Sequence, residues 1–159
     1  MINGVKIKKL IVRQDIPDTP LVDNNQTGFL LEVLRDDDKL QKKFGQTTFT
    51  VAYPGTIKAF HWHKKQDDLW FVATGKAKVV LHDLRQRSKT FGQTQVIYAG
   101  TDNYQLILIP AGVVHGYQVV GDSPVMLFYH TTRHYNSKNP DEQRLAYNDP
   151  AINFDWQKN

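Results

Sequence analysis

Residues 55–75 read GTIKAFHWHKKQDDLWFVATG, with a glycine at each end and the pair His61 and His63 between them. In an extended strand, residues two positions apart share a face, so both imidazoles point to one side of the chain and Trp62 points to the other. The carboxylates of Asp67 and Asp68 follow within a few residues. Imidazoles and a carboxylate can therefore converge on one small volume, and the stretch predicts a strand that carries a functional site.

Around this stretch, length and composition indicate one domain over residues 1–159. The chain is 40% hydrophobic, and its length allows a sizeable core. No apolar run approaches the roughly 20 residues of a membrane span, and residues 1–15 lack the uninterrupted apolar segment of a secretory signal. The absence of cysteine excludes disulfides and thiolate ligands. We expect a cytoplasmic protein with no membrane partner.

The formal net charge of +4 narrows the choice of partner. The lysines and arginines are scattered, without a long basic helix or an RNA-binding aromatic motif, so we expect no nucleic-acid partner. Most of these cations are expected on solvated strand edges, where lysine suppresses sheet-to-sheet aggregation. A phosphate-bearing small molecule is the best remaining use of the basic surplus.

Short runs rich in Val, Ile, Leu, Thr and aromatic residues alternate with glycine- and proline-containing turns, which indicates a β-sandwich or barrel. A helix of one or two turns is expected at Asp37–Phe44, with aspartates at its start and lysines at its end. Apolar residues in the segment 137–159 are expected to hold it across the barrel. The predicted strands are Val5–Arg13, Gly28–Leu34, Gln46–Tyr53, Ile57–Trp62, Leu69–Thr74, Lys76–Asp83, Thr94–Tyr98, Gln105–Ile109, Gly116–Val120 and Val125–Thr131.

Several motifs carry a family resemblance. The spacing within residues 55–75 resembles the first signature of the cupin superfamily, and Pro110-x-Gly112-x-x-His115 resembles part of the second. More specifically, residues 82–93 (HDLRQRSKTFGQ), 109–117 (IPAGVVHGY) and 148–150 (NDP) are similar to blocks of the dTDP-4-dehydrorhamnose 3,5-epimerases, whose second block reads IP-x-G-x-x-HGF. The resemblance covers most of the chain. It implies an all-β, cupin-type jelly-roll β-barrel with a short helix.

The chemistry of that family implies roles for four residues. A ketone at C4 of the sugar acidifies the protons at C3 and C5; a base removes one, an enolate forms, and an acid returns a proton on the other face. The resemblance implies His61 as the base, Tyr129 as the acid with Tyr135 as a second candidate, and His115 beside the developing oxyanion. It also implies a nucleotide-sugar substrate, no required cofactor and a homodimer.

The chain departs from the family at several positions. Where the family has an arginine before the base, this chain has Lys58. The family's strand-borne lysine aligns near Asp68 of this chain, which reverses the charge. The family's partner aspartate for the base would lie beyond Asn159. Candidates to replace that aspartate are Asp67, Asp68 and Asp149. The candidate substrate contacts are Glu32, Gln46, Lys58, Lys64 and Asp149.

A metal site is the alternative interpretation of the same residues. Cupins that bind a metal use both histidines of the first signature, an acidic residue after them and the histidine of the second. Here the ligands would be His61, His63, Asp67 or Asp68, and His115. Three imidazoles and a carboxylate suit Fe, Mn, Ni, Zn or Cu.

Three functions follow from these patterns. The first is an isomerase, a nucleotide-sugar epimerase that acts on a 4-keto-6-deoxy sugar through the base His61. The second is a metal-dependent cupin enzyme, either an oxygenase or a metal-assisted isomerase. The third is a non-catalytic barrel that binds a sugar nucleotide. Proton exchange between sugar and solvent, and its response to a chelator, distinguishes the three.

Overall fold

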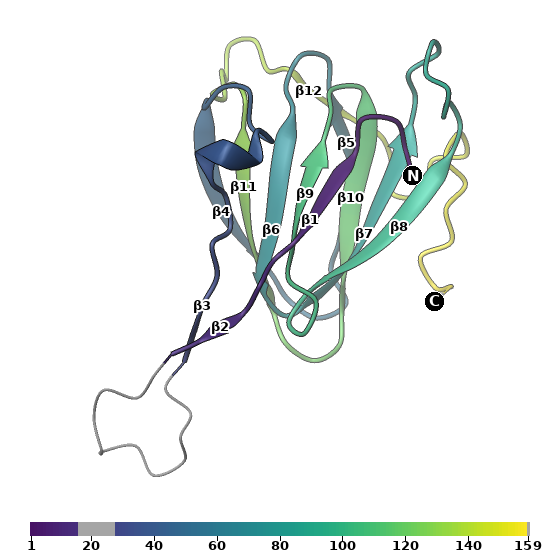
Figure 1. The fold of residues 1–159 in the computed structure, drawn as a ribbon. Helices are drawn as coiled ribbons and strands as arrows, with labels where there is room; N and C mark the ends of the chain where they lie inside the picture. Colours follow the sequence, from purple (N-terminus) through teal and green to yellow (C-terminus); the bar gives the residue numbers. More distant parts are fainter. Residues whose placement is uncertain (16–27, 159) are drawn as a thin grey trace.

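A computed structural model describes residues 1–15 and 28–158, which form two facing antiparallel sheets and a short ribbon (Figure 1). One sheet has the strand order β1-β9-β6-β11-β4. Its strands are β1 (Lys6–Lys9), β9 (Gln105–Ile109), β6 (Asp68–Thr74), β11 (Val125–Thr131) and β4 (Gln46–Ala52).

The other sheet has the strand order β12-β5-β10-β7-β8. Its strands are β12 (Glu142–Arg144), β5 (Ile57–His63), β10 (Val113–Val120), β7 (Lys76–Asp83) and β8 (Thr94–Gly100). The all-β jelly-roll prediction is confirmed.

The ribbon pairs β2 (Arg13–Gln14) with β3 (Phe29–Leu30) and projects from one end of the barrel (Figure 1). The predicted single strand Val5–Arg13 is thus two shorter strands, β1 and β2. Of the predicted strand Gly28–Leu34, only the two residues of β3 are paired as a strand. The other predicted strands are present with small shifts at their ends. β12 was not predicted.

The predicted helix Asp37–Phe44 is wrong. The structure has one 3-10 turn there, η1 (Asp36–Asp38), which ends at Lys39 in the left-handed conformation with φ of 52°. A left-handed residue cannot continue a helix, and the side chain of Asp38 accepts the backbone N–H of Arg35 across the turn. In the described residues, no helix is long and apolar enough to cross a membrane.

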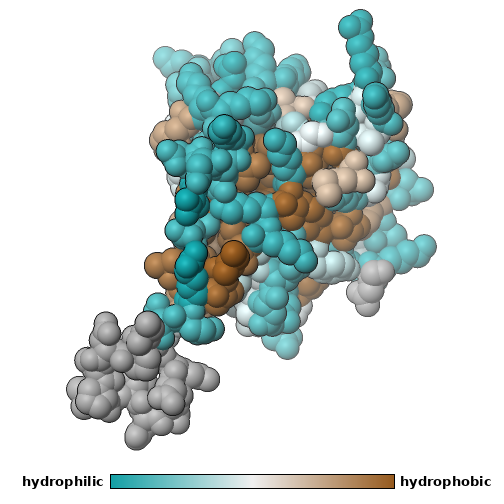
Figure 2. All heavy atoms as spheres, viewed as in Figure 1, coloured by the Kyte–Doolittle hydropathy of each residue, from teal (hydrophilic) through white to brown (hydrophobic). Residues whose placement is uncertain are grey.

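Three apolar clusters hold the barrel together. The main one lies between the sheets and includes Trp70, Val79, Ile107 and Leu127. The second lies on the outer face of β6 and β9, and the segment around residues 31–40 covers it. Figure 2 shows hydrophobic atoms near the foot of the β2–β3 ribbon and across the middle of this view, between hydrophilic side chains. Both sheets therefore have apolar residues on the inside and on part of the outside.

The third cluster lies behind β5 and β10, where the C-terminal segment crosses the sheet as expected. Ile152 and Trp156 are buried there, while Leu145 and Phe154 are partly buried against the cluster. The fifth apolar residue of the segment, Tyr147, stays 53% exposed. This segment fixes β5 from outside the barrel, and β5 carries the two histidines of the central motif.

Candidate active site

A cavity of about 510 Å³ opens between the two sheets. The wall contributed by β5 includes Lys58 and His61, and the opposite sheet contributes Trp70 and Tyr129. Tyr117 of β10 and the charged residues of β12 complete the polar part of the lining. The remaining residues of the lining are Thr50, Ile57, Ala59, Phe60, Leu127 and Leu145. The cavity therefore combines apolar walls with a small number of polar groups, as ligand sites do.

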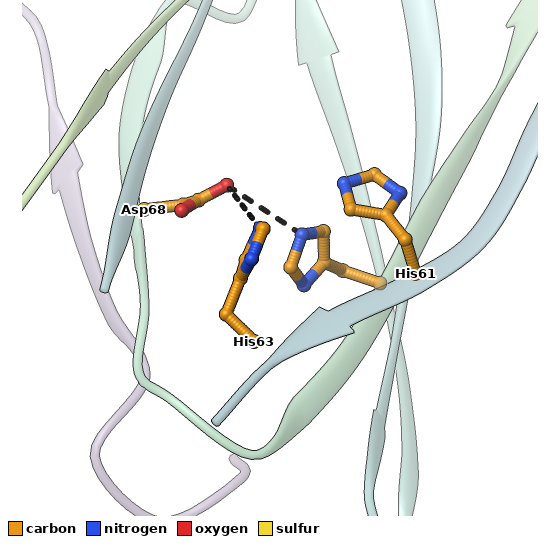
Figure 3. Close-up of side chains that lie close together, drawn as sticks. His61, His63 and Asp68 are labelled. Carbon is orange, nitrogen blue, oxygen red and sulfur yellow. Dashed lines mark ion pairs between the residues drawn. The ribbon is translucent and has the colours of Figure 1, made fainter. Parts of the chain in front are cut away.

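Beside this cavity, four residues predicted from the sequence meet inside the barrel. His61 and His63 project from the same face of β5, and Asp68 faces them from β6 of the other sheet (Figure 3). His115 lies directly across from His61 on β10, with the two ring centroids 4.2 Å apart. One ligand-type atom from each of these four residues lies within 4.8 Å of the others.

Asp68 is the centre of this group. Its Oδ2 lies 3.6 Å from Nε2 of His115 and 3.7 Å from Nε2 of His63. Its Oδ1 accepts a 2.8 Å hydrogen bond from Gln66, and the Trp70 indole donates to Oδ2. A carboxylate that is 1% exposed is therefore surrounded by donors, which stabilises its charge.

These contacts give the three ionisable neighbours different charge states. Burial acts to raise the pKa of Asp68, but His115 and His63 outweigh it and hold this pKa well below its usual range. Burial also acts to lower the pKa of His63, but Asp68 outweighs it and raises this pKa. Burial, and then His115, lower the pKa of His61 well below its usual value. His61 is therefore neutral near neutral pH and able to accept a proton.

The structure separates the two candidate acids. Tyr129 lies on β11, is half-buried and lines the cavity with His61. Burial, and then the charges of Asp68 and Glu142, raise its pKa. Tyr135 is 63% exposed and lies outside the lining; its backbone N–H donates to Gln46. Of these two tyrosines, Tyr129 is the one that lines the same cavity as His61.

Asp67 does not join the central group. Its Oδ1 accepts the backbone N–H of Ala111, its Oδ2 lies 3.3 Å from Nζ of Lys42, and its backbone N–H donates to Thr132. It therefore holds the loop that precedes β10, while the next residue, Asp68, turns inward. Asp149 likewise has a local partner, since its carboxylate accepts the backbone N–H of Ala151.

Of the candidate substrate contacts, Lys58 is part of the cavity lining. Its Nζ donates to the hydroxyl of Thr50 and to the carbonyl of Val51. The others, Glu32, Gln46, Lys64 and Asp149, lie outside the lining. Glu32 pairs with arginines near the ribbon, and Gln46 is bonded to Thr48. Their roles in binding stay predictions.

Two charged residues at the cavity were missed by the sequence reasoning. Strand β12 pairs with β5 and places Glu142 opposite His63 and Arg144 opposite His61. The sequence signal for this strand is that Glu142 and Arg144 stand two residues apart and so share a face. A pattern of three residues is too short to predict a strand. Gln66, which follows the lysine pair Lys64 and Lys65, is buried against Asp68.

The central group fits a divalent metal by the nature of its donors. His115 donates from Nδ1 to the carbonyl of Val113 and directs Nε2 toward Asp68, which is how metal-binding imidazoles are usually held. Nδ1 of His63 and Nε2 of His115 are buried without a hydrogen-bond partner among the described residues. His61, His63, Asp68 and His115 could therefore hold such an ion.

Comparison with known proteins gives concordant matches. Residues 18–159 match the family model described as dTDP-4-dehydrorhamnose 3,5-epimerase. The chain is 51% identical to the spore coat polysaccharide biosynthesis protein SpsL of Bacillus subtilis, over 98% of this chain and 97% of that protein. It is 34% identical to the probable low-salt glycan biosynthesis epimerase Agl13 of Haloferax volcanii, over 85% and 88% of the two chains. A crystal structure of a dTDP sugar isomerase from Desulfovibrio desulfuricans superposes with a TM-score of 0.85 at 28% identity, covering 98% and 92%.

Proposed function

Because the chain belongs to the dTDP-4-dehydrorhamnose 3,5-epimerase family and is thus an isomerase, we propose that it epimerises a nucleotide-activated 4-keto-6-deoxy sugar with His61 as the base. The observation that carries the proposal is the placement of His61 and Tyr129. They project from opposite sheets into one cavity. Abstraction on one face of a sugar ring and protonation on the other require two groups placed in this way.

The charge states suit the two roles. His61 is neutral because burial and His115 lower its pKa, so a lone pair is available. Tyr129 keeps its proton because burial raises its pKa. The bond between carbon and hydrogen at C3 or C5 breaks, the proton passes to His61, and the electron pair moves onto the C4 oxygen. Tyr129 then donates a proton to the carbon from the opposite face, and solvent restores both groups.

Asp68 supports the base through His115. Of the three candidates for the partner carboxylate of the base, Asp68 is the one that reaches the histidines. Its negative charge favours an imidazolium beside it and so stabilises the site after proton transfer. Asp68 is thus a positioning residue for His61.

The nucleotide end of the substrate would meet the cations at the cavity. Lys58 lies in the lining, and Arg144 lies across from His61 on β12. Guanidinium and ammonium groups bind diphosphate oxygens through charge-assisted hydrogen bonds. A sugar diphosphate is therefore the ligand class that the polar part of the cavity favours.

Proton NMR of dTDP-4-keto-6-deoxyglucose in D2O tests the proposal. The wild-type protein should remove the C3 or C5 proton signal, and His61→Ala should abolish this exchange. His134→Ala is the matched control, because His134 is exposed and lies outside the cavity lining. Exchange at C3 alone would mark a mono-epimerase. No exchange by the wild-type protein would contradict the proposal for this substrate.

A metal-assisted isomerase is a second candidate, which the group His61, His63, Asp68 and His115 supports. An ion held by these residues would polarise the C4 carbonyl as a Lewis acid. The same NMR experiment with a strong chelator separates the candidates. Exchange that survives the chelator supports a cofactor-independent base, whereas exchange that is lost and returns with one added metal supports the ion.

We further propose a cytoplasmic homodimer that acts in polysaccharide biosynthesis. The names of the two curated relatives support the biosynthetic role. Exposed apolar side chains support an interface: Phe29 and Leu30 on the projecting ribbon, and Phe49, Met126 and Phe128 on the outer face of β4 and β11. Light scattering after gel filtration should give twice the chain mass of 18.3 kDa. A monomer at micromolar concentration would contradict the dimer.

A further inference from the structure

The position of Tyr117 places a third polar side chain against the substrate. Tyr117 follows His115 by two residues on β10, and the pairing of β10 with β7 is regular through both, so both side chains point into the barrel. Tyr117 is 3% exposed and lines the cavity. Its ring meets Trp70 edge-on, with centroids 5.8 Å apart, which holds the phenol in place.

The hydroxyl of Tyr117 is buried and makes no well-formed hydrogen bond among the described residues; the Thr50 side chain acts on it only as a weak partner, and the Thr50 hydroxyl also accepts from Nζ of Lys58. A buried hydroxyl without a good hydrogen bond destabilises the fold, so native proteins keep few of them. A tyrosine hydroxyl keeps its proton near neutral pH. The group therefore remains a neutral phenol, which can donate a hydrogen bond to a ligand in the cavity.

The reaction needs a donor at the C4 oxygen, and one of the two nitrogens of His115 is already engaged elsewhere. The sequence placed His115 beside the developing oxyanion. In the structure, its Nδ1 donates to the carbonyl of Val113, and its Nε2 faces Asp68 at 3.6 Å. Nδ1 is therefore not available to the sugar, and the Tyr117 hydroxyl is a second donor beside Nε2. In the family block that residues 109–117 resemble, phenylalanine stands where this chain has Tyr117, so the hydroxyl is an addition to that pattern.

We propose that the Tyr117 hydroxyl donates a hydrogen bond to the C4 oxygen of the sugar, an inference that rests on the proposed epimerase function. As His61 takes the proton from carbon, negative charge gathers on this oxygen, and the hydrogen bond strengthens. Tyr117 keeps its proton throughout, and when Tyr129 protonates the carbon the charge leaves the oxygen again. A donor that acts more strongly on the enolate than on the ketone accelerates the reaction.

Tyr117→Phe tests this with the dTDP-4-keto-6-deoxyglucose exchange assay. The loss of one oxyanion donor should lower kcat by about 10- to 1000-fold, with a smaller change in KM. Loss of C–H exchange and loss of epimerised product should occur together. The melting temperature should stay equal or rise, because the variant removes a buried hydroxyl without a good hydrogen bond. Tyr147→Phe, at an exposed tyrosine outside the cavity lining, is the control and should leave all these quantities unchanged.

Tyr129→Phe gives the comparison that separates the two phenols. Without the acid, His61 can still remove the proton and return a deuteron to the same face, so exchange should continue while epimerised product is lost. Tyr117→Phe should slow both. A Tyr117→Phe rate within twofold of wild type, or a rate lost together with a large fall in melting temperature, would overturn the inference alone. A wild-type protein without exchange would overturn the proposed function and this inference with it.

Discussion

At the residue scale, Asp68 sets the charge pattern of the site. It is an almost fully buried carboxylate between two imidazoles, and it stands near the position where the family pattern has a lysine. A carboxylate there favours cationic imidazoles, whereas a lysine would disfavour them. A carboxylate at this position therefore accounts for the two histidines, His63 and His115, that lie around one of its oxygens.

Asp68→Asn should lower the pKa of His63 below its usual value, because burial then acts without the opposing carboxylate. NMR titration of the imidazole C–H signals measures this change, and sugar proton exchange should slow by at least about tenfold. Asp67→Asn removes the same charge one residue away and should leave the His63 titration as in the wild type, because Asp67 is bonded to Ala111 outside the group. An unchanged His63 pKa in Asp68→Asn would refute the role given to Asp68.

At the scale of elements, the close approach of β5 to β10 places His61 opposite His115. The register between these strands shifts between His115 and Tyr117, at Gly116. A Cβ added to Gly116 would lie 2.4 Å from Cβ of Ala59. Gly116→Ala should therefore push β5 outward, destabilise the fold by about 1–3 kcal/mol and slow proton exchange, because His61 lies on the displaced strand.

The double variant Gly116→Ala, Ala59→Gly is the control, since it removes the side chain that the new methyl group meets. It should recover part of the lost stability, as measured by urea unfolding, although backbone atoms of β5 remain within 2.8 Å of the added Cβ. If Gly116→Ala proved as stable and as active as the wild type, close strand approach would not be what positions His61.

The hairpin of β7 and β8 depends on the buried carboxylate of Asp83. Burial acts to raise the pKa of Asp83, but hydrogen bonds from Arg85, Ser88 and Thr90 outweigh it and hold this pKa well below its usual range. The folded pKa lies below the unfolded one, so this contribution to stability is present above about pH 4 and is lost as the pH falls further.

Asp83→Asn should therefore reduce the free energy of unfolding by about 2 kcal/mol at neutral pH. The difference from wild type should shrink as the pH falls below about 4, because the wild-type carboxylate then takes up a proton. Urea unfolding at several pH values measures this. Asp122→Asn, at an exposed turn, should show no such pH dependence. A difference that stayed constant down to about pH 2 would exclude the charge as its cause.

At the scale of the whole molecule, the C-terminal segment supports the site from outside the barrel. Trp156 packs on Phe60, with ring centroids 5.3 Å apart, and its indole donates to the carbonyl of Tyr147. The buried Nζ of Lys78 donates to the carbonyls of Trp156 and Lys158. These contacts fix the segment against the back of β5, the strand that carries His61.

Trp156→Ala should reduce the free energy of unfolding by about 3–5 kcal/mol and lower the melting temperature by about 10 °C. Proton exchange should also slow below the melting temperature, because Phe60 precedes His61 on β5. Calorimetry and the NMR assay measure the two effects. Phe91→Ala, at a phenylalanine that is 54% exposed, should change neither. A Trp156→Ala protein with the wild-type melting temperature would show that the segment is not part of the fold's support.

Most features that depend on residues close in sequence were predicted correctly, whereas features that depend on contacts between distant strands were not. Strand alternation is local, so β5 and the shared face of His61 and His63 were predictable. Helix formation at Asp37–Phe44 looked favourable from end charges alone, but the left-handed Lys39 ends the turn. Glu142 and Arg144 could not be assigned to the cavity, because only pairing with β5 makes their segment a strand.

The sequence by itself determined the family, the all-β barrel and the histidines of the site, because motif spacing and the alternation of side chains are properties of the chain alone. Only the tertiary structure shows that Asp68 and not Asp67 lies in the histidine group, and that Tyr129 and not Tyr135 lines the cavity, because residues close in sequence separate when one faces the barrel interior and the other faces a loop or solvent. It alone shows that the Tyr117 hydroxyl is buried without a well-formed hydrogen bond. Burial and the unmet hydrogen bond depend on the packing of distant strands, which no local pattern records.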